Sequence, residues 1–123
     1  MRTGAISING EKHALCFSLR VVKACVERYG SASGLYDALS SADELKALDE
    51  SMWVLSEMMR AGEKYAKANG IDNPPPMSLD ELYDMCDIGD FSNLRTSIIE
   101  TINNGRATSV EVDSPNAKAT QGS

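Results

Sequence analysis

Few residues in this chain have the types and spacing that enzyme chemistry requires. The single histidine, His13, and one of the three cysteines, Cys25, could in principle form a base and nucleophile pair. Cys25 falls beside the apolar stripe of an expected helix and His13 on an expected strand, so we interpret Cys25 as a buried, inert thiol. One histidine and no Cys-x-x-Cys pair leave a structural zinc site short of ligands. We therefore expect no enzyme activity, no catalytic residue, no cofactor and no bound metal.

A group of carboxylates between residues 80 and 90 is the second candidate site. Its spacing lacks the Asp-x-Asp-x-Asp-Gly pattern of an EF-hand loop. Several of its members stand at expected helix N-termini, where the helix dipole favours anions. We interpret the group as capping and solvated residues, namely Asp80, Glu81, Asp84, Asp87 and Asp90.

Trp53 is the residue best suited to recognise another protein. On a helical wheel it lies among charged residues, including Glu57 and Arg60, about 100° from the centre of an apolar stripe. A Trp in this setting is either covered by another part of its own chain or meets a partner. We take Trp53, Glu57 and Arg60 as candidate partner-binding residues. Several methionines at helical spacing could form an adaptable binding groove, or could belong to the core.

A long helix expected over residues 43–69 positions Trp53. Ser41 and Glu44 form the capping-box pattern ahead of it, while Gly70 and Pro74 follow it. Two adjacent apolar stripes predict that this helix packs from two sides and forms the centre of the core. The first stripe contains Leu45, Leu48, Met52, Leu55 and Met59, of which we expect Leu48, Met52 and Leu55 to be fully buried.

The N-terminal segment predicts a β-hairpin, because Asn9-Gly10 separates two stretches that alternate in polarity. Such a hairpin must lie on helices, gain a third strand or pair with another copy. Ser18 is expected to cap the next helix, which Gly30 ends. Its expected inward residues are Leu19, Val22, Val26 and Tyr29.

The C-terminal half predicts shorter helices and a tail. We expect a helix from Ser78 to about residue 87, and a last helix that begins after Asp90 and ends at Gly105. Residues 106–123 have no aromatic residue and are predicted to be a disordered tail, with a short added strand as an alternative. The predicted fold is mainly α: about five helices and an N-terminal hairpin in a single domain over residues 1–105.

Composition excludes several classes of partner. The formal charge is −6, and no cluster of Lys and Arg could follow a phosphate backbone, so we expect no nucleic acid partner. No apolar run has the length of a membrane span, so we expect no membrane contact, and the first residues lack the apolar core of a signal peptide. Three widely spaced cysteines are typical of a reducing cytosol.

Short motifs follow one another in an order that resembles a known family. Ile-x-Ile-Asn-Gly-Glu at residues 6–11 precedes Leu-x-Phe-Ser-Leu-x-x-Val at 15–22 and Glu-Arg-Tyr-Gly at 27–30. Then come SGLYDAL, MMRAGEKYAKANG and MSLDELYDMCDIGD. This order resembles the tail assembly chaperones of long-tailed phages and gene transfer agents, and the similarity covers about residues 4–104. The three cysteines and Trp53 are not part of it.

The resemblance implies a small, mostly helical, non-enzymatic protein that acts in the host cytoplasm and is absent from the mature virion. Family members bind the tape-measure protein, keep its apolar helices from aggregating and help to recruit tail-tube protein. They can self-associate, some into rings, and many have a longer form made by translational frameshift. Two alternatives stay open: a small helical head–tail connector protein of the virion, and a small regulatory binding protein such as an anti-repressor.

Overall fold

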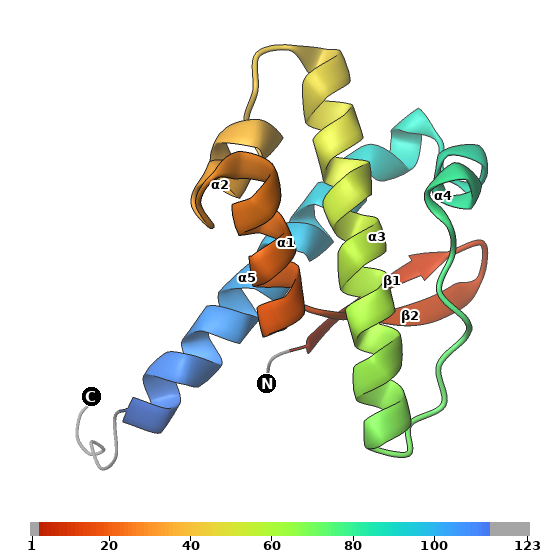
Figure 1. Cartoon of the computed structure of the whole chain (residues 1–123). Helices are drawn as coiled ribbons and strands as arrows, with labels where there is room; N and C mark the ends of the chain where they lie inside the picture. Colours follow the sequence, from red (N-terminus) through yellow and green to blue (C-terminus); the bar gives the residue numbers. More distant parts are fainter. Residues whose placement is uncertain (1–2, 114–123) are drawn as a thin grey trace.

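A computed structural model describes the backbone of residues 3–113 and the side chains of residues 3–105. Within this part the chain is mainly helical, with five α-helices and an N-terminal antiparallel hairpin, which confirms the predicted fold class (Figure 1). The elements are β1 (Thr3–Ile8), β2 (Glu11–Cys16), α1 (Leu19–Tyr29), α2 (Gly34–Leu39), α3 (Glu44–Ala68), α4 (Leu79–Met85), the 3-10 helix η1 (Ile88–Asp90) and α5 (Phe91–Asp113).

The hairpin forms where the sequence predicts it. Asn9 and Gly10 both have positive φ, 52° and 81°, as a two-residue turn of this kind requires. The strands pair with Ala5 opposite Ala14, and Ile6, Ile8 and Leu15 are buried. Of the three settings open to it, the hairpin takes the first: α3 packs against β2 and α5 against β1.

The long helix α3 is the centre of the molecule and crosses the hairpin in Figure 1. Gly62 permits this crossing, because a Cβ there would lie 1.9 Å from the carbonyl oxygen of Ala14. Gly4 plays the same part on β1, where a Cβ would lie 2.1 Å from Oγ1 of Thr101 on α5. Gly62 therefore does not interrupt the helix; its missing side chain lets the β2 backbone approach.

The hydrophobic core lies between the hairpin, α3 and α5. Met52, Met58 and Met59 are at most 2 % exposed, so the core explanation holds for these three methionines. Met52 and Leu55 are buried as predicted, but Leu48 is only partly buried and Leu45 is 66 % exposed. The first apolar stripe thus leaves the core at its N-terminal end, where the described elements leave the Leu45 side chain largely exposed.

The inward face of α1 differs from the prediction. Val21 and Cys25 are its buried residues, whereas Leu19 is 83 % exposed and Val26 is 43 % exposed. The helix is rotated by about one residue position, near 100°, relative to the expected stripe. Cys25 behaves here as a small apolar residue and enters the core with no exposed surface.

Two helix ends differ from the prediction. Asp43, not Ser41, caps α3 and accepts hydrogen bonds from the N–H groups of Leu45 and Lys46. The helix α5 does not end at Gly105 but continues to Asp113. Gly105 is buried against Phe17, where a Cβ would lie 3.3 Å from Cβ of Phe17, so it serves close packing rather than termination.

The predicted disordered tail over residues 106–123 is therefore wrong for residues 106–113, which are helical. Figure 1 shows this last part of α5 extending away from the other elements. The remainder of the predicted tail, residues 114–123, lies outside the described residues.

Candidate partner-binding surfaces

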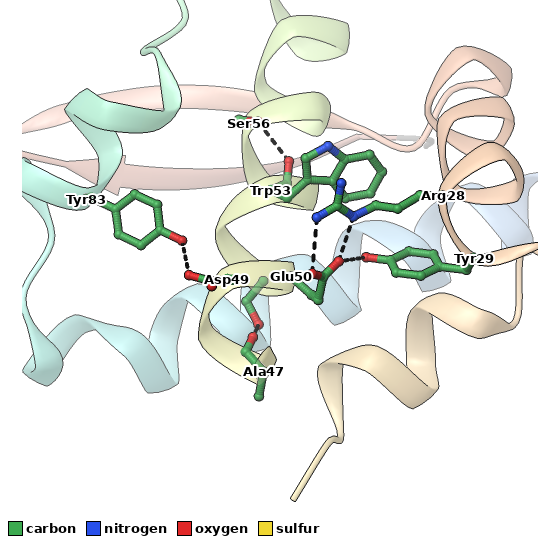
Figure 2. Close-up of polar contacts among 9 residues, drawn as sticks. Arg28, Tyr29, Ala47, Asp49, Glu50, Trp53, Ser56 and Tyr83 are labelled. Carbon is green, nitrogen blue, oxygen red and sulfur yellow. Dashed lines mark hydrogen bonds and ion pairs between the residues drawn. The ribbon is translucent and has the colours of Figure 1, made fainter. Parts of the chain in front are cut away.

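Trp53 is covered by side chains from α1. The Arg28 guanidinium carbon lies 4.5 Å from the centre of the Trp53 ring, and the Tyr29 ring meets Trp53 edge-on at 5.8 Å. Glu50, one turn before Trp53 on α3, accepts hydrogen bonds from Arg28 at 2.7 and 3.1 Å and from the Tyr29 hydroxyl at 2.5 Å. Figure 2 shows this group. We call it the Arg28–Trp53 junction, and it consists of Arg28, Tyr29, Glu50 and Trp53.

The electrostatics of the junction follow from this geometry. The hydrogen bond from Arg28 holds the pKa of the Glu50 carboxyl below its usual range. Burial, reinforced by the nearby Glu50 carboxylate, raises the pKa of the Tyr29 hydroxyl. Glu50 is therefore ionised and Tyr29 neutral near pH 7, which suits a charge-assisted link between two helices. This packing accounts for Trp53 without a partner, and its role as a partner anchor stays a prediction.

Glu57 and Arg60 follow Trp53 on α3 by about one and two turns, but they are not among the four residues of the junction. They form an ion pair on α3 and line a groove of about 500 Å³ between α1 and the C-terminal half of α3. Arg20 and Lys64 also line this groove, whereas Trp53 does not. The structure thus brings two of the three candidate residues together and places the third at the Arg28–Trp53 junction.

A second groove lies at the N-terminal end of α3. Leu45 and Leu48 of α3 line a hollow of about 760 Å³ together with Ile88 of η1 and Phe91 of α5. An adjoining hollow of about 600 Å³ shares Ile88 and Phe91 and continues to Ile99. Ile88 is 87 % exposed, which makes it the most exposed of the large apolar residues in the described part of the chain. We call this surface the Leu45 groove.

His13 and Cys25 do not form a catalytic pair. Neither ring nitrogen of His13 has a hydrogen-bond partner among the described residues, although the ring is fully buried, and its nearest carboxylate is Glu11 at 4.0 Å. Burial, with a smaller contribution from Glu57, raises the pKa of the Cys25 thiol to about 11. The expected burial of Cys25 is confirmed. A neutral buried thiol is a poor nucleophile, so its inertness stays the prediction.

Most of the acidic group is engaged in capping, as predicted. Glu81 and Ser78 form a reciprocal capping box on α4, with hydrogen bonds of 2.8 and 3.1 Å. Asp87 and Asp90 do the same around η1, so Asp87 caps the turn that leads into α5 and Asp90 lies inside it. Within the described residues, no three side chains of His, Cys, Asp or Glu are placed to hold a metal ion.

Sequence reasoning missed the Leu45 groove. It assigned Leu45 to the core and gave Ile88 no role. A sequence feature could have drawn attention to Ile88, which stands in the turn Asp87-Ile-Gly-Asp90, where a polar residue would be usual. The Arg28–Glu50 contact had no such feature, because its two residues come from different helices.

Comparisons of the chain with protein-family models, with curated proteins and with solved structures find no match. Among the residues that the structure describes, no helix combines the length and apolar character needed to cross a membrane.

Proposed function

We propose that this chain is a tail assembly chaperone of a long-tailed phage or gene transfer agent. In this proposal it is non-enzymatic, acts in the host cytoplasm and is absent from the mature virion. It binds the tape-measure protein through that protein's apolar helices, and helps to recruit tail-tube subunits. The ordered motifs over about residues 4–104 support the choice of family.

The structural observation that carries the proposal is the exposure of apolar side chains beside the Leu45 groove. Leu45 and Ile88 are 66 % and 87 % exposed, and they stand on the rim of a hollow with apolar walls. Exposed apolar side chains that gather beside a groove are typical of an interaction site rather than of surface that only contacts solvent. A protein that shields apolar helices of another protein requires such a surface.

The direct test begins with gene neighbours and ends with co-expression. A tail-tube gene upstream and a very long tape-measure gene downstream are expected. That tape-measure protein, expressed alone, should be largely insoluble; expressed with this chain, it should move to the soluble fraction and co-purify. A tape-measure protein whose solubility and recovery are the same with and without this chain would contradict the proposal.

Purified particles separate the proposal from the connector alternative. Mass spectrometry of mature particles should detect tube and tape-measure proteins but not this chain. Stoichiometric recovery of the chain with particles would favour a connector protein of the virion instead.

A further inference from the structure

The Leu45 groove has an apolar floor and an apolar rim. Leu48 and Phe91 are partly buried in it, while Leu45 and Ile88 stand on its rim. The hollow continues along α5 to Ile99, so the apolar surface is elongated rather than round. An elongated apolar groove accommodates the apolar stripe of an amphipathic helix.

The charges around the groove are mainly negative. Glu44 lines one end and Glu100 the other, and neither has a hydrogen bond or ion pair within the described residues. The one cationic side chain in the lining is Arg95, whose Nη2 donates a hydrogen bond to the Leu39 carbonyl at 2.9 Å. Lys46 follows Leu45 but lines neither hollow of the groove.

Two occupants from the chain itself are disfavoured. Residues 114–123, SPNAKATQGS, contain no Val, Leu, Ile, Met or aromatic residue, so this segment has no side chain suited to the groove. A second copy that met the first groove to groove would bring the carboxylates of Glu44 and Glu100 of one copy close to those of the other. The lining holds two carboxylates against one guanidinium, that of Arg95, so it stays net negative and charge repulsion opposes such a contact. Each copy also carries a formal charge of −6.

We propose that the Leu45 groove binds an amphipathic helix of another protein whose apolar stripe is flanked by Lys or Arg. The apolar stripe packs on Leu48 and Phe91 between Leu45 and Ile88, and the basic flanks meet Glu44 and Glu100. This inference deepens the proposed function, and rests on it, because it names the surface and the chemistry by which client helices are held.

The test uses the full chain and two synthetic helical peptides of about 18 residues, a length of about 27 Å. One peptide combines a Leu stripe with Lys flanks, and the other replaces every Lys by Glu. Isothermal titration calorimetry should show that the Lys peptide binds at least about tenfold more tightly. Leu45→Asp and Ile88→Asp should each weaken its binding by about tenfold, because each removes an apolar contact with the Leu stripe and places a charged group against it.

The sign of these changes distinguishes the groove from general charge attraction. Each substitution to Asp makes the chain more acidic, so non-specific attraction of a basic peptide would become stronger. Leu19→Asp is the matched control, because Leu19 is 83 % exposed on α1 and lines neither hollow of the groove. Leu19→Asp should leave the affinity unchanged or slightly increase it. Circular dichroism should show all three variants folded, since each replaces an exposed side chain.

Three results of the peptide titrations would overturn the inference: equal binding of the two peptides, an unchanged or increased affinity in Leu45→Asp, or an equal loss in Leu19→Asp. Sedimentation that shows a dimer of the parent chain, dissociated by Leu45→Asp, would assign the groove to a second copy instead. The two proposals can fail separately. Tape-measure protein rescued equally by the parent and by Leu45→Asp would keep the function and remove the groove. If the groove binds the Lys peptide but the chain does not solubilise the tape-measure protein, the groove proposal would stand and the proposed function would fail.

Discussion

The N-terminal half of α3 presents two surfaces that contain large apolar side chains, and the two differ in how far those side chains are covered. At the Arg28–Trp53 junction, a large aromatic side chain is covered by a cation, a second ring and a carboxylate from two helices. At the Leu45 groove, the apolar side chains of Leu45 and Ile88 stay 66 % and 87 % exposed. One surface is closed by the chain itself, and the other is left open.

The comparison shows why a helical wheel misassigned both surfaces. A wheel marks Trp53 as misplaced because charged residues surround it, yet Arg28 is a suitable cover: its guanidinium stacks on the ring while Glu50 neutralises it. A wheel marks Leu45 as buried because it continues a stripe, yet the described elements nearby leave its side chain 66 % exposed. Burial depends on what lies opposite a residue, which its own helix does not specify.

The core between these two surfaces should give the largest effect of substitution. Leu55 is fully buried, so Leu55→Ala should lower the free energy of unfolding by about 2–5 kcal/mol through lost transfer energy and a new cavity. Urea denaturation measures this loss. A loss below about 0.5 kcal/mol would show that the core collapses around the site or that Leu55 is not in it.

Trp53→Ala should give the next largest effect and separates the closed surface from the open one. Trp53 is partly buried and carries the Arg28 and Tyr29 contacts, so the substitution should cost about 2–3 kcal/mol. Trp53→Phe keeps an aromatic face and should cost less. Leu45→Ala, at the open surface, should change stability by less than about 0.5 kcal/mol.

Equal stability of Trp53→Ala and the parent would reverse this assignment. It would mean that the Arg28 and Tyr29 contacts contribute nothing in solution, and that Trp53 is available to a partner. Reduced co-purification of a client by such a variant would then restore Trp53 as a binding residue.

Local features of this fold could be predicted from the sequence, and contacts between distant segments could not. The Asn9-Gly10 turn, the Ser78–Glu81 capping box and the extent of α3 depend on neighbouring residues, and all three follow the prediction. The role of Gly62 depends on Ala14, nearly fifty positions away, so no local pattern predicts it. The end of α5 was misplaced for the same reason, because Gly105 packs against Phe17.

The candidate surfaces divide in the same way. Glu57 and Arg60 are one turn apart on α3, and their pairing follows from spacing alone. The Arg28–Trp53 junction and the Leu45 groove each combine residues from separate helices, so their existence depends on how those helices pack. No periodicity within a single segment contains that information.

The pH dependence of stability tests whether the junction is closed by charge. The pKa of Glu50 is lowered in the folded chain, first through its hydrogen bond from Arg28. The stabilisation is therefore present above the ordinary pKa of 4.5 and is lost as the pH falls through the folded value. Glu50→Gln should lower stability by about 1–2 kcal/mol at pH 7, and the difference from the parent should shrink below about pH 4.

Glu44→Gln is the matched control for this experiment. Glu44 also lies on the N-terminal half of α3, but it has no ion pair or hydrogen bond in the described part of the chain. Its substitution should change stability little at either pH. A Glu50→Gln variant whose deficit is the same at pH 7 and at pH 3.5 would show that Glu50 acts through shape or packing rather than through its charge.

The smallest expected effect belongs to Ile88→Asn at the open surface. Ile88 is 87 % exposed in η1 between two reciprocally bonded aspartates, and the backbone bonds of that turn involve Asp87 and Asp90, not the Ile88 side chain. The substitution should therefore change the free energy of unfolding by less than about 0.5 kcal/mol. Asn is also well tolerated in turns, so no backbone strain is introduced. Urea denaturation of Ile88→Asn beside Trp53→Ala gives the comparison directly. A loss of 2 kcal/mol or more in Ile88→Asn, on the order of a buried apolar residue, would mean that something covers Ile88 in solution. A negligible loss, together with weaker binding of the Lys peptide, would mean that this isoleucine serves recognition and not the fold.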